Sequence, residues 1–254
     1  MFVKNRVKIR TRLYSHMHVF YQPDITLPFI TLSEEESKHC VRVLRLQNGD
    51  KIFLADGNGK LATAQITDNH PKKCVLQIVS VEQFLREESS GRQYYLHIMI
   101  APTKNMERVE WFIEKATEVG IDEITFIETE NSERNKVNMD RCLKIAISAM
   151  KQSKQWYLPK INELKSLKET LQQQLTGAKY VAWCEADKTQ LFSNMLDKQE
   201  KYFTVLIGPE GDFTTQEINA CLQSGFVPVS FGATILRTET AALYGVMAIK
   251  ALHS

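Results

Sequence analysis

The chain has 254 residues, of which 43% are hydrophobic and 24% are charged, a balance typical of a folded protein with one large or two ordinary domains. No stretch reaches the roughly 18 uncharged apolar residues of a membrane span, and the basic N-terminus lacks an apolar signal segment. The five cysteines and six histidines show no metal-ligand spacing. We therefore expect a cytoplasmic protein with reduced thiols, no membrane segment and no metal.

Basic residues are unevenly distributed along the chain, although the net charge is only +2. Five of them lie within the first 12 positions, and between Arg134 and Lys168 nine basic residues accompany only two acidic ones. A solvated helix face and a phosphate-binding surface both produce such a segment. Charge alone leaves the two interpretations open.

The first part of the chain has the pattern of a small β-rich module. Ser33, followed three residues later by Glu36, is a capping-box pattern that predicts a helix over about residues 34–44. Asp-Gly-Asn-Gly at 56–59 separates two strand-like runs and predicts a β-hairpin. Ahead of these elements lies a basic extension, residues 1–16, which we expect to be flexible. Further strands are predicted just after Met17 and at 74–81.

A polar segment at residues 85–93 contains Gly and Ser and shows no periodicity. This composition is typical of a linker, so we place the domain boundary there. The predicted organisation is a first domain at 17–84, the linker, and a second domain at 94–254.

After the linker, strand-like and helix-like runs alternate. Val109, Phe112 and Ala116 recur at helical spacing, for example, and Gly120 is a natural end to their helix. Strands that alternate with helices predict an α/β domain with a parallel sheet. The predicted strands are 94–101, 123–129, 179–185, 203–208 and 227–232, and the predicted helices lie around 109–119, at 139–152, from Ser166, at 214–225 and at 238–252.

The loop Ile207–Phe213, with the sequence Ile-Gly-Pro-Glu-Gly-Asp-Phe, joins a predicted strand to a predicted helix. Gly208 and Gly211 would let a ligand approach the backbone closely, and Pro209 stiffens the turn. Parallel sheets bind ligands at the carboxyl ends of their strands. The alternative is an ordinary turn between a strand and a helix.

A second loop, Phe231–Ala241, also joins a strand to a helix, with one of two threonines as a possible cap. Arg237 stands where the last helix begins, although a helix N-terminus disfavours cations. The position indicates either a pairing with Glu239 or Glu210 or a role toward an anionic substrate. A surface arginine is the alternative.

The two loops together, Ile-Gly-Pro-Glu-Gly and Ile-Leu-Arg-Thr-Glu-Thr-Ala, resemble the bacterial 16S ribosomal RNA uridine-N3 methyltransferase family (RsmE) of the SPOUT superfamily. The resemblance covers most of the chain from Met17. The segment 39–45 is similar to the H-x-x-x-V-L-R helix of that family, and 104–120 is similar to its lysine-rich helix. Walker and dinucleotide-binding motifs, by contrast, are absent from the sequence.

The resemblance implies a PUA-like RNA-binding barrel followed by a SPOUT-type α/β domain, whose parallel sheet ends in a C-terminal trefoil knot. The implied activity is methylation of N3 of a uridine in 16S ribosomal RNA, within the small ribosomal subunit, by a homodimer that uses S-adenosylmethionine. The implied cofactor-binding residues are Leu206, Ile207, Gly208, Glu210, Gly211, Phe231, Gly232, Ile235, Leu236 and Thr240.

Arg237 is the leading candidate for the group that stabilises a uracil anion, with Glu239 to orient it rather than act as the base. Arg45 and Lys104 are second choices for the same role. For RNA binding, the resemblance and the basic segment together give His39, Arg42, Arg45, Lys104, Arg108 and Arg141.

Three other functions stay open at this point. The first is a SPOUT methyltransferase that acts on another RNA. The second is a non-catalytic RNA-binding assembly factor with vestigial cofactor loops. The third is a nucleotide-binding α/β enzyme that does not act on RNA, for which the basic segment would be incidental.

Overall fold

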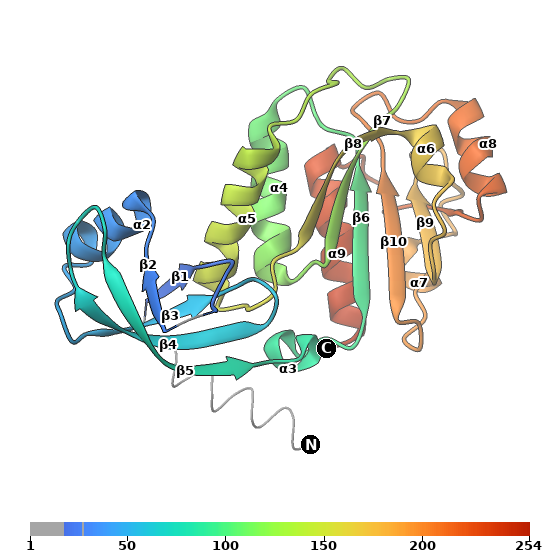
Figure 1. Cartoon of the computed structure of the whole chain (residues 1–254). Coiled ribbons are helices and arrows are strands. Elements are labelled where there is room, and N and C mark those ends of the chain that lie inside the picture. The colour runs from blue at the N-terminus through green and yellow to red at the C-terminus, as the bar shows by residue number, and fades with distance from the viewer. Residues whose placement is uncertain (1–17, 27) are drawn as a thin grey trace. The chain divides into compact units, whose positions relative to one another are not determined.

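The computed structural model describes residues 18–26 and 28–254, which form two compact units (Figure 1). Unit 1 contains the described residues up to Arg92 together with Met150–Leu158, and unit 2 contains Gln93–Ala149 and Pro159–Ser254. The extension expected to be flexible, 1–16, lies outside the described residues. No helix in the described ranges is long and apolar enough to cross a membrane.

Unit 1 is a curled five-stranded sheet with the strand order β1-β3-β4-β5-β2. The β1–β3 pair is parallel and the other neighbouring strands are antiparallel. The elements are β1 (Val19–Tyr21), β2 (Phe29–Thr31), α2 (Glu34–Lys38), the π-helix η1 (His39–Val43), β3 (Lys51–Ala55), β4 (Lys60–Asp68), β5 (Val75–Gln83) and α3 (Arg86–Ser90).

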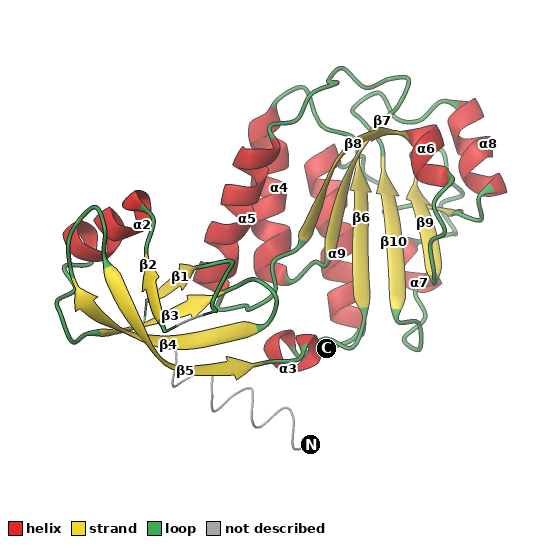
Figure 2. Ribbon diagram, viewed as in Figure 1, coloured by secondary structure: helices red, strands yellow, loops and turns green. Residues whose placement is uncertain are grey.

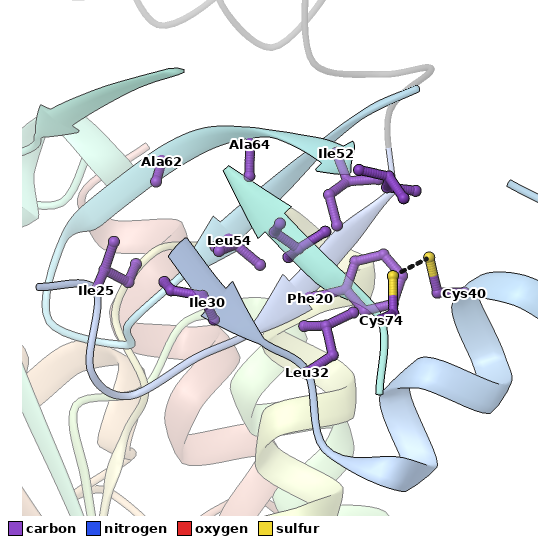
Figure 3. Packing of buried hydrophobic residues seen from close by; sticks show 12 residues of the cluster. Phe20, Ile25, Ile30, Leu32, Cys40, Ile52, Leu54, Ala62, Ala64 and Cys74 are labelled. Carbon is purple, nitrogen blue, oxygen red and sulfur yellow. Dashed lines mark hydrogen bonds between the residues drawn. The ribbon is translucent and has the colours of Figure 1, made fainter. Parts of the chain in front are cut away.

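Strand β3 is buried on both faces, which gives unit 1 two apolar clusters. Ile52 and Leu54 point into a cluster with Phe20 and with the thiols of Cys40 and Cys74, whose sulfur atoms are 4.0 Å apart (Figure 3). The alternate residues of β3 point the other way, because successive side chains in a strand face opposite sides. This second cluster consists of Phe53, Ala55, Leu61, Phe84, Met150 and Trp156.

The predicted hairpin is confirmed, since β3 and β4 pair around residues 56–59. Asp56 closes the turn: its Oδ1 accepts from the backbone N–H groups of Asn58 at 2.7 Å and Lys60 at 2.9 Å. Gly57 and Gly59 have φ angles of +80° and +91°, a region that glycine adopts without strain. The turn residues therefore specify the hairpin locally.

Unit 2 is built on a six-stranded sheet with the order β11-β9-β10-β6-β7-β8, in which every neighbouring pair is parallel. This confirms the predicted α/β class (Figure 2). The strands are β6 (Tyr95–Ile100), β7 (Glu123–Glu128), β8 (Lys160–Ser166), β9 (Ala178–Ala182), β10 (Tyr202–Ile207) and β11 (Val227–Val229). The helices are α4 (Met106–Val119), α5 (Met139–Ser153), α6 (Leu167–Leu171), α7 (Phe192–Met195), α8 (Thr215–Gln223) and α9 (Thr238–Leu252). The last residues of α5, from Met150, are counted with unit 1.

Helices cover both faces of this sheet (Figures 1 and 2). On one face α9 packs on β6 and β10, where Gly245 approaches Ile98 and Val205, and α4 packs beside α9. On the other face Met99 and Leu206 pack in a cluster with residues of α6 and α8. Burial on both faces explains why the inner strands β6, β7 and β10 of this sheet have mostly apolar sequences.

His97 is the main exception to the apolar pattern of β6. Its Nε2 lies 2.7 Å from Thr125 Oγ1, and its ring is nearly fully buried. Burial lowers the pKa of His97 to about 4, outweighing the nearby carboxylate of Glu123. His97 is therefore neutral at pH 7, so its 3.9 Å approach to Glu123 is not an ion pair at that pH.

This lowered pKa predicts a loss of stability in acid. The unfolded chain binds a proton at His97 near pH 6.5 while the folded chain does so only near pH 4, so the free energy of unfolding falls as the pH drops between these values. Urea unfolding at pH 7.5 and pH 5 measures the loss, and the His97→Gln variant is the reference. An equal loss in both proteins would contradict the assignment to His97.

Candidate cofactor and substrate site

The two loops singled out in the sequence are joined to each other in unit 2. Thr238 Oγ1, at the start of α9, donates to the carbonyl oxygen of Gly208 at 3.1 Å. β10 and β11, which lead into these loops, are separated in the sheet by β9. The hydrogen bond therefore ties together two segments that come from non-adjacent strands.

The first loop is held in shape by polar contacts on both sides. Asp212 has a φ of +58°, and its carboxylate accepts from the backbone N–H groups of Cys184 at 3.0 Å and Phe213 at 2.9 Å. Asn131 Nδ2 donates to the carbonyl oxygens of Gly211 at 3.1 Å and Asp212 at 3.0 Å. These contacts fix the backbone that follows β10 before any ligand binds.

Glu210 connects this loop to the segment after β6. Its Oε1 accepts from the backbone N–H of Lys104 at 3.2 Å, and the Lys104 ammonium pairs with Glu133 at 2.9 Å. Arg134 donates to the carbonyl oxygen of Lys104 at 2.7 Å. Loops after three strands, β6, β7 and β10, thus meet at the carboxyl edge of the sheet.

The second loop presents open backbone and apolar surface. Gly232 has a φ of +118°, and no atom lies within 4 Å of the position that a Cβ would take. Ile235 is 86% exposed, while the Phe231 ring packs against the rings of Phe192 and Tyr244 at centroid distances of 5.1 and 4.9 Å. In this segment, the backbone at Gly232 and the side chain of Ile235 are therefore accessible to a ligand.

The other predicted cofactor residues divide between the core and the surface. Leu206 is fully buried with its side chain in the apolar cluster, and Ile207 and Gly208 are buried at the end of β10. Leu236 is half-buried, and Gly211 and Thr240 are exposed. Leu206 thus packs in the core rather than forming the wall of an open slot.

The start of α9 departs from two expectations. No threonine caps the helix: the N-cap is Arg237, which makes no side-chain capping bond, and Thr238 bonds instead to Gly208. Among the described residues, the exposed Arg237 forms no ion pair with Glu239 or Glu210, and Glu210 bonds to the backbone of Lys104. Glu239 is only 7% exposed, and its Oε2 has no hydrogen-bond partner there.

A pocket of about 300 Å³ opens between α4 and the start of α9. It brings Arg108 together with Arg237 and Glu239, three residues singled out in the sequence. Trp111, which is 42% exposed, was missed, although its place outside the apolar stripe of α4 was a signal in the sequence. The lining residues are Asn105, Glu107, Arg108, Trp111, Arg237, Glu239 and Thr240.

Arg141, in the same unit, is already engaged within the protein. Its guanidinium makes a two-point contact with the carboxylate of Glu110 on α4, in which Nη2 lies 2.7 Å from Oε2. Paired hydrogen bonds of this kind are among the stronger polar contacts in proteins. The contact holds α5 against α4.

The three RNA-binding candidates of unit 1 lie on or next to η1. The expected helix is present, but its second half widens into a π-helix, in which Leu44 N–H bonds to the carbonyl oxygen of His39. Arg45, just after it, has a φ of +57°. His39, Arg42 and Arg45 are all exposed. Irregular helical turns of this type are frequent at functional sites.

No cluster of three or more His, Cys, Asp or Glu side chains that could hold a metal ion occurs within the described part of the chain.

Family comparisons agree with this architecture. A model of an RNA methyltransferase domain matches residues 91–250, and a model of an RNA methyltransferase PUA domain matches residues 32–79. The curled β-sheet unit and the parallel six-stranded unit thus define a SPOUT-type RNA methyltransferase that carries a PUA domain.

Individual relatives make the assignment narrower. The ribosomal RNA small subunit methyltransferase E of Buchnera aphidicola is 27% identical over 92% of this chain and 92% of its own length. A structure from Porphyromonas gingivalis, described as a "probable rRNA-methyltransferase", is 35% identical with a TM-score of 0.84, over 93% of this chain and 98% of that one. The chain belongs to the ribosomal RNA small subunit methyltransferase E family (RsmE).

A third relative was solved with its cofactor. This protein of Legionella pneumophila, described as a methyltransferase, is in complex with bound S-adenosylmethionine. It is 28% identical to this chain with a TM-score of 0.82, and the match covers 93% of this chain and 98% of that one.

Proposed function

We propose that this protein transfers the methyl group of S-adenosylmethionine to N3 of a uridine in 16S ribosomal RNA. The observation that carries the proposal is the bond between Thr238 and Gly208, which joins two backbone loops beside a pocket lined by Arg237 and Glu239. The relatives named as small subunit methyltransferases support the choice of RNA, and the cofactor-bound relative supports the choice of methyl donor.

The loops fit the cofactor on their own geometry. No atom lies within 4 Å of a Cβ position at Gly232, and the side chain of Ile235 is largely exposed, so both are accessible to a ligand. We assign cofactor contacts to the loops 206–211 and 231–236 and to Thr240, with Leu206 contributing at most through its backbone, because its side chain is in the core. When bound, S-adenosylmethionine supplies an activated methyl group.

Arg237 is proposed to stabilise the uracil as its N3 proton leaves. Loss of that proton places negative charge on the ring oxygens, and a fixed cation beside them lowers the energy of the transition state. The guanidinium is exposed and forms no ion pair with the neighbouring Glu239 or Glu210 in the described part of the chain, so it is available to a substrate.

We further propose that the enzyme works in the cytoplasm as a homodimer on the small ribosomal subunit. Part of the surface of α9 is apolar in one protomer, where the large side chain of Met247 is 53% exposed. A second copy would cover such a surface. Sedimentation should show a dimer, and an active monomer would contradict this part of the proposal.

The RNA substrate distinguishes the remaining alternatives. We expect the label of S-adenosylmethionine to appear in small subunits that lack the modification. It should appear neither in tRNA nor in 23S ribosomal RNA. Label in either of the latter would indicate a SPOUT enzyme with another target. Failure to bind the cofactor at all would indicate a non-catalytic assembly factor.

Binding of RNA by η1 gives a separate prediction. Replacing Arg42 with Ala should weaken the binding of small-subunit RNA and reduce the slope of log affinity against log salt by about 0.7–0.9, the value for one lost phosphate contact. Affinity for S-adenosylmethionine should stay unchanged. The control is Lys51→Ala, an exposed cation outside η1 in the same unit. An unchanged salt slope in Arg42→Ala would remove this residue from the RNA contact.

A further inference from the structure

The carboxylate of Glu239 is unusual among the polar groups of the pocket. Its side chain is buried, yet no described residue donates a hydrogen bond to Oε2. A buried acceptor without a donor is energetically costly, so such groups are usually satisfied by a ligand or water or have a chemical role. Glu239 lines the pocket, so a donor bound there would be a neighbour of this carboxylate.

The pocket is suited to a pyrimidine base. Its volume of about 300 Å³ is at the lower end of the range for small-molecule sites. Trp111 offers an exposed aromatic surface on which a base can stack, while Arg108 and Arg237 can donate to ring oxygens. Uracil presents two such oxygens with the N3–H donor between them, which complements two guanidinium groups and one free carboxylate oxygen.

We propose that Glu239 accepts the N3 proton of the target uracil, an inference that rests on the proposed function. The N3–H bond breaks, its electron pair remains on the uracil, and the proton moves to Oε2 of Glu239. The N3 lone pair then forms the bond to the methyl carbon, and the pair of the breaking carbon–sulfur bond stays on sulfur. The proton on Glu239 is finally released to solvent, so charge and atoms balance. Glu239 is thus a catalytic residue rather than an orienting partner of Arg237, since no ion pair joins the two side chains among the described residues.

The test compares wild type with Glu239→Gln in single-turnover methylation of small subunits. We expect the variant to be at least about 100-fold slower, because proton transfer to a positioned group contributes about 10²–10⁴ in rate. Its rate should rise about tenfold per pH unit between pH 7 and 9, since proton loss to solvent now limits the reaction, while the wild-type rate depends less on pH. Subunits built on RNA with 5-fluorouridine, whose N3 proton is more acidic, should restore much of the variant's rate. Glu114→Gln, a carboxylate on α4 that does not line the pocket, should behave as wild type.

Further measurements distinguish a catalytic role of Glu239 from a structural one. Cofactor affinity by calorimetry and dimerisation by sedimentation should be unchanged in Glu239→Gln, and a loss of either would show a structural or interface role instead. An unchanged rate and pH profile would also overturn the inference. If Glu239→Gln fails to fold, Glu239→Asp keeps a carboxylate and should keep the shallow wild-type pH profile; the steep profile would contradict us. Failure of wild type to form 3-methyluridine would instead contradict the proposed function itself.

Discussion

Replacing Arg237 with alanine is expected to lower kcat by about 100- to 1000-fold, the range for removing one group that stabilises developing negative charge. The guanidinium lines the pocket and has no ion pair with its acidic neighbours, so its removal should cost transition-state stabilisation and little folding stability. Binding of S-adenosylmethionine, measured by calorimetry, should change by less than about threefold, because the cofactor residues lie in the loop backbones.

Two comparisons define what would contradict this role. Lys168→Ala removes the same charge from the surface of α6, and it should leave kcat unchanged. Arg237→Lys keeps the charge but loses the planar pair of donors, so partial activity is expected. Near-normal turnover in Arg237→Ala with intact cofactor binding would show that another group stabilises the uracil.

Replacing Gly208 with alanine is expected to weaken binding of S-adenosylmethionine by at least about tenfold, which corresponds to about 1.4 kcal/mol. The new Cβ would lie 2.9 Å from Cε2 of Phe213, a ring buried in the apolar cluster, so the loop or the ring must shift. The carbonyl oxygen of Gly208 would then move relative to Thr238, which fixes the second loop. Calorimetric titration of the variant measures the loss.

The control for this effect is Gly91→Ala, which lies far along the chain from the loops and where no atom lies within 4 Å of the Cβ position. Its φ of +69° disfavours alanine, so this variant shows what backbone strain alone, away from the loops, does to cofactor binding. Its cofactor affinity should equal that of wild type. If Gly208→Ala also binds the cofactor normally and folds stably, the loop after β10 is not part of the cofactor site.

Much of the fold could be predicted because it depends on local patterns. The hairpin at 56–59 follows from its turn residues, and the α/β class follows from the alternation of apolar runs with amphipathic helices. β2 and β8 were missed for physical reasons: β2 has three residues, and β8 is an edge strand of mixed polarity, so neither carries a continuous apolar run. The segment predicted as a linker, 85–93, contains the short helix α3.

The site was predictable only in part. The residue types of the two loops indicated a ligand-binding role. That the two loops bond to each other could not be predicted, because it depends on the strand order. β9 lies between β10 and β11 in the sheet, and the sequence does not reveal this order. The pocket depends on the packing of α4 against α9, and so Trp111 was overlooked. The expected threonine cap was wrong because Thr238 bonds across to Gly208. The trefoil knot and the individual roles of the site residues stay predictions.

The identity of the methylated nucleoside tests the central claim most directly. Purified protein would be incubated with labelled S-adenosylmethionine and with small ribosomal subunits from a strain that lacks the modification, and the RNA digested and analysed by mass spectrometry. We predict that the label appears in 3-methyluridine from 16S ribosomal RNA. Label in any other nucleoside, or none while the cofactor is bound, would contradict the proposed reaction.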